Sequence, residues 1–430
     1  MARLTSRQIL TRLFFLSTVG LVLLLLVTFW REFNPEWGPY QVAYARMLAQ
    51  KTGQRPPFFT PLEVKQAYLP QLGRTDRCMT CHLGVDNPKM ADVPQPFRMH
   101  PNYQTHPFDE YGCTVCHGGQ GTAVTKADAH GFVKHWERPM LPKTMLAASC
   151  TSCHDLGPGI AEPSPNVSHE TWRMPKGTER LVRAKALFDQ LGCIGCHAVR
   201  GWGGPVSTDL ATVAYKGLDE FDFRYVHGPH TAVNWNLEHF KNPQQVNPGD
   251  LASKVPPTPM PNYQLTDEET MDLTTLVFSF SHEEVPSKYR VAAAPVAAPS
   301  APANGRPVSA VEHGRAVFQR YGCIGCHGIE GRGGVRNDNA ATGGEVPPLT
   351  YVAQGFTNDQ LKALIRAGRY PTKADPNGPT PPLWMPTWKD KLSDEELDAV
   401  VEYLISLYPA DTAPVASASA AHTTTTPEVH

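Results

Sequence analysis

The chain has 430 residues, which is too many for one compact core and enough for two or three domains. Its formal net charge is -2 at pH 7, so no basic excess indicates nucleic-acid binding and no acidic block marks a solvating tail. Proline is abundant, at 41 residues, and this composition predicts a loop-rich protein with short helices.

The first predicted element is a transmembrane helix. Three arginines precede an apolar run from Leu13 to Trp30, which has about the length needed to cross a bilayer. The arginines favour a cytoplasmic N-terminus, with the rest of the chain on the far side. A cleaved signal peptide is the alternative, because residues 43–45 fit the small-x-small rule. That position lies well beyond the apolar run, so the sequence favours an uncleaved single-pass anchor at 1–31 in a bacterial inner (cytoplasmic) membrane.

All ten cysteines lie in five C-x-x-C-H motifs. This is the attachment signature of haem c: two thiols add to the porphyrin vinyl groups, and the histidine becomes the proximal iron ligand. The motifs predict five covalent haem c groups on the periplasmic side. The predicted attachment residues are Cys78, Cys81, Cys113, Cys116, Cys150, Cys153, Cys193, Cys196, Cys323 and Cys326. The predicted proximal ligands are His82, His117, His154, His197 and His327.

Other uses of paired cysteines fit this pattern poorly. A zinc site closes one tetrahedron with two C-x-x-C units, and five is an odd number of units. A disulfide framework would not give every cysteine one spacing with a histidine behind it. A thioredoxin-like redox motif would occur once.

The fourth and fifth motifs belong to an internal repeat. Residues 179–197 and 312–327 each predict a short amphipathic helix that runs into a Cys-Ile-Gly-Cys-His motif. A Met-Pro pair follows in each repeat, at Met260 and Met385. Each repeat ends in a predicted helix with a capping box: Thr266 with Glu269, and Ser393 with Glu396.

Both repeats resemble class I cytochrome c domains, over residues 176–285 and 308–408. The resemblance implies Met260 and Met385 as distal iron ligands, and terminal helices that cross beside the haem. In the last domain, Gly314 and Phe318 would meet Tyr403 at this crossing. In the earlier domain, Ala184 and Phe188 take the matching places on the first helix. There the residue nearest to the position of Tyr403 is Phe278, which lies two positions off its register. The resemblance also implies a proline carbonyl that holds the proximal histidine. Pro347 fits this role in the last domain, whereas Thr208 stands at the matching place earlier and Pro205 is the substitute considered.

The first three motifs predict a loop-rich tri-haem domain over residues 32–175, in which porphyrins supply the apolar core. Each iron needs a sixth ligand, and histidines outside the motifs are the candidates. They are His100, His106, His130 and His135, with His169 further off, and we favour His106, His130 and His135. The rival ligands are Met90, Met99, Met140 and Met145.

Residues 70–155 are similar to the tri-haem part of membrane-anchored multihaem cytochromes found beside cytochrome b-type, quinol-oxidising (bc-type) subunits. The similarity rests on Asp76 to Gly84, Phe97 to His106 and Gly112 to Gly121. It implies a quinol-oxidising membrane partner.

These features together predict a mostly α protein that relays electrons from a quinol-oxidising complex to a soluble or membrane acceptor. Residues 286–307 are expected to form an Ala/Pro-rich linker, and 409–430 a disordered tail. The chain by itself is expected to be an electron-transfer subunit rather than an enzyme. The alternative is a multihaem reductase of nitrite, hydroxylamine or peroxide with one open catalytic haem.

Overall fold

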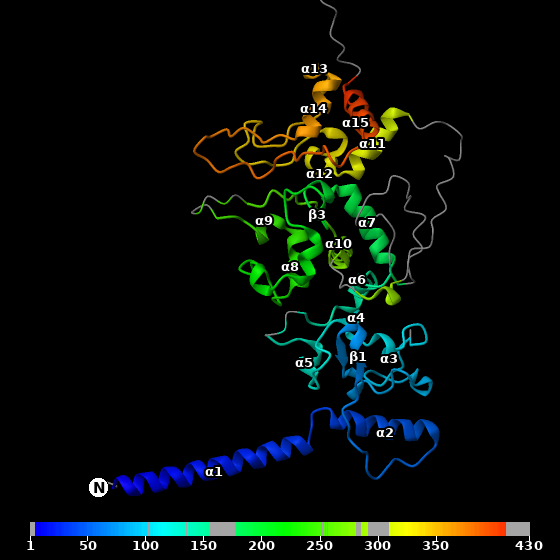
Figure 1. Cartoon of the computed structure of the whole chain (residues 1–430), viewed down its shortest axis with the longest axis vertical. Coiled ribbons are helices and arrows are strands. Elements are labelled where there is room, and N and C mark those ends of the chain that lie inside the picture. The colour runs from blue at the N-terminus through cyan, green and yellow to red at the C-terminus, as the bar shows by residue number, and fades with distance from the viewer. Residues whose placement is uncertain are drawn as a thin grey trace, which may run out of the picture. The chain divides into compact units, whose positions relative to one another are not determined.

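The computed structural model is mostly helical (Figure 1). The chain divides into two compact units. It describes residues 5–101, 103–134, 136, 138–154, 177–250, 253, 255, 257–280, 285–290 and 309–409. Unit 1 comprises Met1–Ser149 and Val285–Tyr289, and unit 2 comprises Cys150–Glu284 and Arg290–His430. The expected tail lies outside the described residues.

The N-terminal helix α1 spans Ser6–Phe33. It begins with a capping box in which Thr5 and Gln8 satisfy each other's backbone N–H groups. No residue of α1 is buried, and the helix is long and apolar enough to cross a membrane. A long apolar helix is therefore present where the sequence predicted one, and its exposed apolar surface is compatible with lipid.

The rest of unit 1 has one longer helix, α2 (Gly38–Thr52), and otherwise short elements. Strands β1 (Ala67–Leu69) and β2 (Arg74–Asp76) form an antiparallel pair. A small core of Met90, Val93 and Phe97 packs against tyrosines of α2. The short helices are α3 (Phe108–Tyr111), α4 (Thr114–His117), α5 (Lys126–His130) and α6 (Ala147–Cys150), the last of which ends at the first residue of unit 2.

Part of the expected linker packs into unit 1. The turn Ser287–Tyr289 places the Tyr289 ring 5.6 Å from the ring of Tyr111, and Tyr289 is buried. Burial of a large aromatic side chain holds this short stretch in place within unit 1. Residues 291–307 lie outside the described part of the chain.

The division between the two units falls at residue 149, so the third motif groups with unit 2. The expected domain boundary at residue 175 lies outside the described residues. The Thr151 hydroxyl donates a 2.7 Å hydrogen bond to the carbonyl of Ser279, which attaches this motif to the end of α10.

The first repeat of unit 2 is built on α7 (Glu179–Leu191), which packs against α10 (Asp267–Phe280). The Phe188 ring lies 5.6 Å from that of Phe280, so Phe280 rather than Phe278 is its partner at this crossing. The smaller elements of this repeat are β3 (Ala198–Val199), β4 (Trp202–Gly203), α8 (Ala232–Lys241) and α9 (Pro243–Val246).

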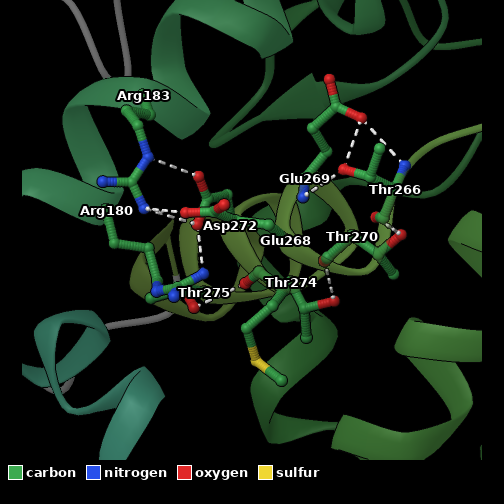
Figure 2. Close-up of polar contacts among 10 residues, drawn as sticks. Arg180, Arg183, Thr266, Glu268, Glu269, Thr270, Asp272, Thr274 and Thr275 are labelled. Atoms are coloured by element: carbon green, nitrogen blue, oxygen red, sulfur yellow. Dashed lines mark hydrogen bonds and ion pairs between the residues drawn. The ribbon is translucent and has the colours of Figure 1, made fainter.

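An ion-pair network joins α7 to α10. Figure 2 shows Arg180 and Arg183 directed at the buried carboxylate of Asp272. Arg183 reaches it at 3.0 Å and also contacts Glu268 at 3.2 Å. Because a buried charge is costly unless paired, the two arginines are what allow Asp272 to lie at this interface.

The second repeat contains α11 (Ala310–Arg320) and α15 (Asp394–Ser406), which lie side by side (Figure 1). Gly314 lets them approach closely, since a Cβ there would lie 1.9 Å from the carbonyl oxygen of Ala399. The Phe318 and Tyr403 rings are 5.4 Å apart, so the expected crossing is confirmed. The other helices are α12 (Cys323–His327), α13 (Val352–Gly355) and α14 (Asn358–Ala367).

Both predicted capping boxes are present. Thr266 accepts a hydrogen bond from the backbone of Glu269, whose carboxylate accepts one in return (Figure 2). Ser393 and Glu396 make the same reciprocal pair at the start of α15. The caps orient each helix as it returns across its partner.

Candidate functional site

The motif histidines of the two repeats each contact a backbone carbonyl. The Nδ1 atom of His197 lies 2.9 Å from the oxygen of Thr208, and that of His327 lies 3.2 Å from the oxygen of Pro347. Engaging Nδ1 in this way leaves Nε2 to bind a metal. Because the acceptor belongs to the main chain, Thr208 serves without a proline, and Pro205 is not needed as a substitute.

The two predicted axial methionines lie on loops that their neighbours hold in place. The Met260 backbone N–H donates to Thr258 Oγ1 at 3.3 Å, and its carbonyl accepts from the side chain of Gln244. The backbone of Met385 makes two hydrogen bonds with Arg369, at 2.8 and 2.9 Å. Loops fixed in this way present each side chain with little conformational freedom.

His239 of α8 joins this region and was not among the predicted ligands. Its Nε2 atom is 3.1 Å from the sulfur of Met260, and its ring stacks on Trp235 with centroids 4.6 Å apart. Its Nδ1 atom is buried without a hydrogen-bond partner. Burial lowers the pKa of His239 to about 3, so the ring is neutral. Trp235 and His239 are four residues apart on one helix face, a spacing that the sequence already contains.

The surroundings of Cys193 and Cys323, the first cysteine of each repeat's motif, suit thioether bonds. Burial raises the pKa values of Cys193 and Cys323 to about 12, which disfavours a thiolate. A thioether carries no charge and is stable in such a place. Burial likewise lowers the pKa values of His197 and His327, which favours the neutral imidazole that ligates iron. The residues of both repeats therefore fit a covalently attached haem.

The fourth and fifth motifs pack against each other within unit 2. The sulfurs of Cys196 and Cys326 are 3.3 Å apart. A Cβ at Gly195 would lie 2.0 Å from the carbonyl oxygen of Gly322, the residue before the fifth motif. In the reciprocal contact, a Cβ at Gly325 would lie 2.2 Å from the carbonyl oxygen of Gly192, the residue before the fourth motif. The glycine shared by the two Cys-Ile-Gly-Cys-His sequences is thus required by their mutual contact.

In unit 1, the first two motifs are joined through Asp76. Its buried carboxylate accepts hydrogen bonds from the backbone N–H groups of Cys113 and Thr114, at 2.5 and 2.9 Å, and from the Thr114 hydroxyl at 2.8 Å. The thiols of Cys78 and Cys113 are hydrogen-bonded to each other. Asp76, two residues before the first motif, therefore anchors the start of the second motif.

Two further histidines face motif histidines in unit 1. The ring centroids of His82 and His130 are 6.3 Å apart, and those of His100 and His117 are 6.1 Å apart. Burial lowers the pKa of all four rings. The structure therefore brings together two pairs of half-buried, neutral imidazoles.

The other candidates have different surroundings. His106 is exposed, with its ring 5.4 Å from that of Tyr111. Met90 and Met145 are fully buried as core side chains. His135 lies outside the described residues, and no sixth ligand is assigned to the third motif, whose histidine is His154.

Comparison with known proteins identifies the two repeats. The Cytochrome c family model matches residues 181–279 and 311–408. These two segments are thus class I cytochrome c domains, which implies covalently bound haem c and haem-based electron transfer. Neither the curated proteins nor the solved structures include a match to this chain.

Proposed function

We propose that this protein is a membrane-anchored pentahaem c-type cytochrome that relays electrons on the periplasmic side of a bacterial inner membrane. The two class I domains account for two haems, and the three earlier C-x-x-C-H motifs provide thiols and histidines for three more. Haem iron supplies one-electron transfer by cycling between ferric and ferrous states. We assign Met260 and Met385 as distal ligands of the class I domains, and histidines to the first three sites.

The observation that carries this proposal is the contact between thiols of neighbouring motifs. Cys196 and Cys326 lie 3.3 Å apart, and Cys78 is hydrogen-bonded to Cys113. Each thiol marks a point of attachment at a porphyrin edge, so adjacent thiols bring neighbouring attachment points together. Electron tunnelling falls steeply with edge-to-edge distance, and such pairing is what a relay needs.

The ligand types suggest a direction. Haems with methionine ligands generally have higher potentials than those with two histidines. Electrons would therefore enter at the first three motifs and leave through the two class I domains. A cytochrome b-type quinol-oxidising subunit is the proposed donor, and a soluble or membrane electron carrier is the proposed acceptor.

Mass spectrometry and potentiometry of the purified full-length chain test this function. We expect the intact mass to contain five haems, and we expect the two methionine-ligated haems to titrate at higher potential than the rest. Fewer haems would contradict the pentahaem assignment. Methionine-ligated haems at the lower potential would reverse the proposed direction.

Gentle solubilisation of the membrane tests the partner. The proposal expects co-purification with cytochrome b and an iron–sulfur subunit, and isolation of the chain by itself would count against it. Carbon monoxide binding to one reduced haem would favour the reductase alternative, whereas low-spin haems unreactive to the gas favour electron transfer.

A further inference from the structure

We propose that His130 is the sixth ligand of the iron held by His82, and that His100 is the sixth ligand of the iron held by His117. This inference rests on the proposed function, because it requires haem on the first two motifs. It replaces His106, which the sequence favoured, with His100.

The separation of the rings carries the assignment. A bond from a transition metal to an imidazole nitrogen is about 2 Å long. Two such bonds in line, with about 1 Å more from each nitrogen to its ring centre, put the ring centres about 6 Å apart. The observed separations are 6.3 Å for His82 and His130, and 6.1 Å for His100 and His117.

The backbone holds both non-motif histidines in place. His130 ends α5, and its carbonyl accepts a 2.9 Å hydrogen bond from Met140. Leu141, the residue after Met140, donates a 2.8 Å hydrogen bond from its backbone N–H to the carbonyl of His117. The backbone N–H of His100 donates to the carbonyl of Val85 at 2.9 Å, just beyond the first motif. Ligands fixed in this way are positioned before iron binds.

The pairing also interlocks the two sites. The segment that follows the first motif carries His100, which serves the second motif. The segment that follows the second motif carries His130, which serves the first. Neither site is complete without residues from the other's part of the chain, in keeping with the carboxylate of Asp76 that already joins them.

Substitution of each histidine in the full-length chain tests the assignment. We expect His100→Leu and His130→Leu each to remove one bis-imidazole haem signal from the near-infrared magnetic circular dichroism and electron paramagnetic resonance spectra. The matched control is His106→Leu, which changes an exposed histidine of the same segment and should leave both spectra unaltered. Intact mass establishes that all haems remain attached in every variant.

The outcomes separate this inference from the proposed function. A wild-type mass without haem on the first two motifs would defeat the proposed function itself. Full haem content with unchanged spectra in His100→Leu or His130→Leu would overturn the ligand assignment only. Loss of a bis-imidazole signal in His106→Leu would return that role to His106. If a variant loses haem through misfolding, His100→Met or His130→Met is used, and a shift from bis-imidazole to His/Met spectra supports the assignment.

A separate observation points to His239. We propose that the Nε2–H of His239 donates a hydrogen bond to the sulfur of Met260. This bond positions the Met260 side chain and raises the reduction potential of the fourth haem. The inference rests on Met260 as the axial ligand of that haem. The two atoms are 3.1 Å apart, and the stack on Trp235 fixes the ring. A thioether that donates one lone pair to iron and accepts a hydrogen bond on the other is a weaker donor to ferric iron.

Potentiometry of a His239 variant tests this role. We expect His239→Leu to lower the midpoint potential of one methionine-ligated haem while the near-infrared band of methionine ligation persists. His227→Leu is the matched control, because this histidine of the same domain is exposed and pairs with Glu238. An unchanged or raised potential in His239→Leu would overturn the proposal. It would also fail if Met260→Leu kept a low-spin, bis-imidazole fourth haem, since His239 would then be the ligand.

Discussion

Glu396 shows how one side chain joins several contacts in the last domain. Its carboxylate caps α15 through Ser393, accepts a 3.0 Å hydrogen bond from the Tyr321 hydroxyl and pairs with Arg320 at 2.9 Å. Partial burial raises the pKa of Glu396, but the hydrogen bonds and the charge of Arg320 outweigh it and leave the pKa below its usual range. A lowered folded-state pKa means that this residue stabilises the folded domain above about pH 4.3 and ceases to do so as pH falls through the folded value.

We predict that Glu396→Gln destabilises the last domain by about 1–2 kcal/mol at neutral pH, because hydrogen bonds to a charged group are lost. Its stability should also fall less steeply on acidification, since the depressed carboxylate no longer titrates. Hydrogen exchange of the α15 amides in the full-length chain, followed from pH 7 to lower values, measures both effects. Glu395→Gln, at the exposed neighbouring position, is the control. Equal acid sensitivity in wild type and Glu396→Gln would contradict the prediction.

At the scale of elements, the two class I domains each pack an N-terminal helix against a C-terminal helix, but different interactions stabilise the two crossings. In the last domain, Gly314 brings α11 against the backbone of α15, over an apolar cluster that includes Phe318 and Tyr403. In the first class I domain, Ala184 lies buried on α7, and the buried Asp272 with its arginines joins the helices. A close backbone approach requires glycine, whereas the crossing with Ala184 tolerates a methyl group and relies on charge pairing.

We predict that Gly314→Ala destabilises the last domain by about 1–3 kcal/mol, despite the higher helix propensity of alanine. The new methyl group would meet the carbonyl oxygen of Ala399, and backbone atoms cannot rotate away as a side-chain end can. Hydrogen exchange of α11 and α15 measures the change. Gly355→Ala is the control, because a Cβ there meets nothing within 4 Å. Wild-type protection in Gly314→Ala would show that the crossing relaxes more readily than the structure indicates.

At the scale of the whole molecule, α1 differs from the rest of the chain. None of its residues is buried, and its apolar side chains have no protein surface to cover them in the described structure. A lipid bilayer supplies an environment for such a helix, since all its backbone hydrogen bonds are internal.

We predict that a chain exported on a cleavable signal and lacking residues 1–33 appears in the soluble periplasmic fraction with its haem spectrum intact. The full-length chain should remain with membranes after an alkaline carbonate wash, because a spanning helix resists it. Haem absorbance in each fraction is the measurement. If the truncated chain stayed with the membranes, a different part of the protein or a partner would be responsible for attachment.

Features defined by local spacing were predictable from the sequence. The C-x-x-C-H motifs, the apolar run of α1 and the capping boxes of Thr266 and Ser393 each depend on residues a few positions apart. Helical periodicity and covalent attachment geometry operate over that same short range, so a linear pattern contains them.

Contacts between distant residues were decided by the tertiary structure. Spacing could not distinguish His100 from His106 for the second site, since both precede a proline in the same loop and only folding places one beside His117. The approach of Cys196 to Cys326, across 130 positions, and that of His239 to Met260 likewise have no local signal. Packing of separate segments determines which of these residues become neighbours. The intervening chain can adopt many conformations, so sequence separation alone does not select one contact.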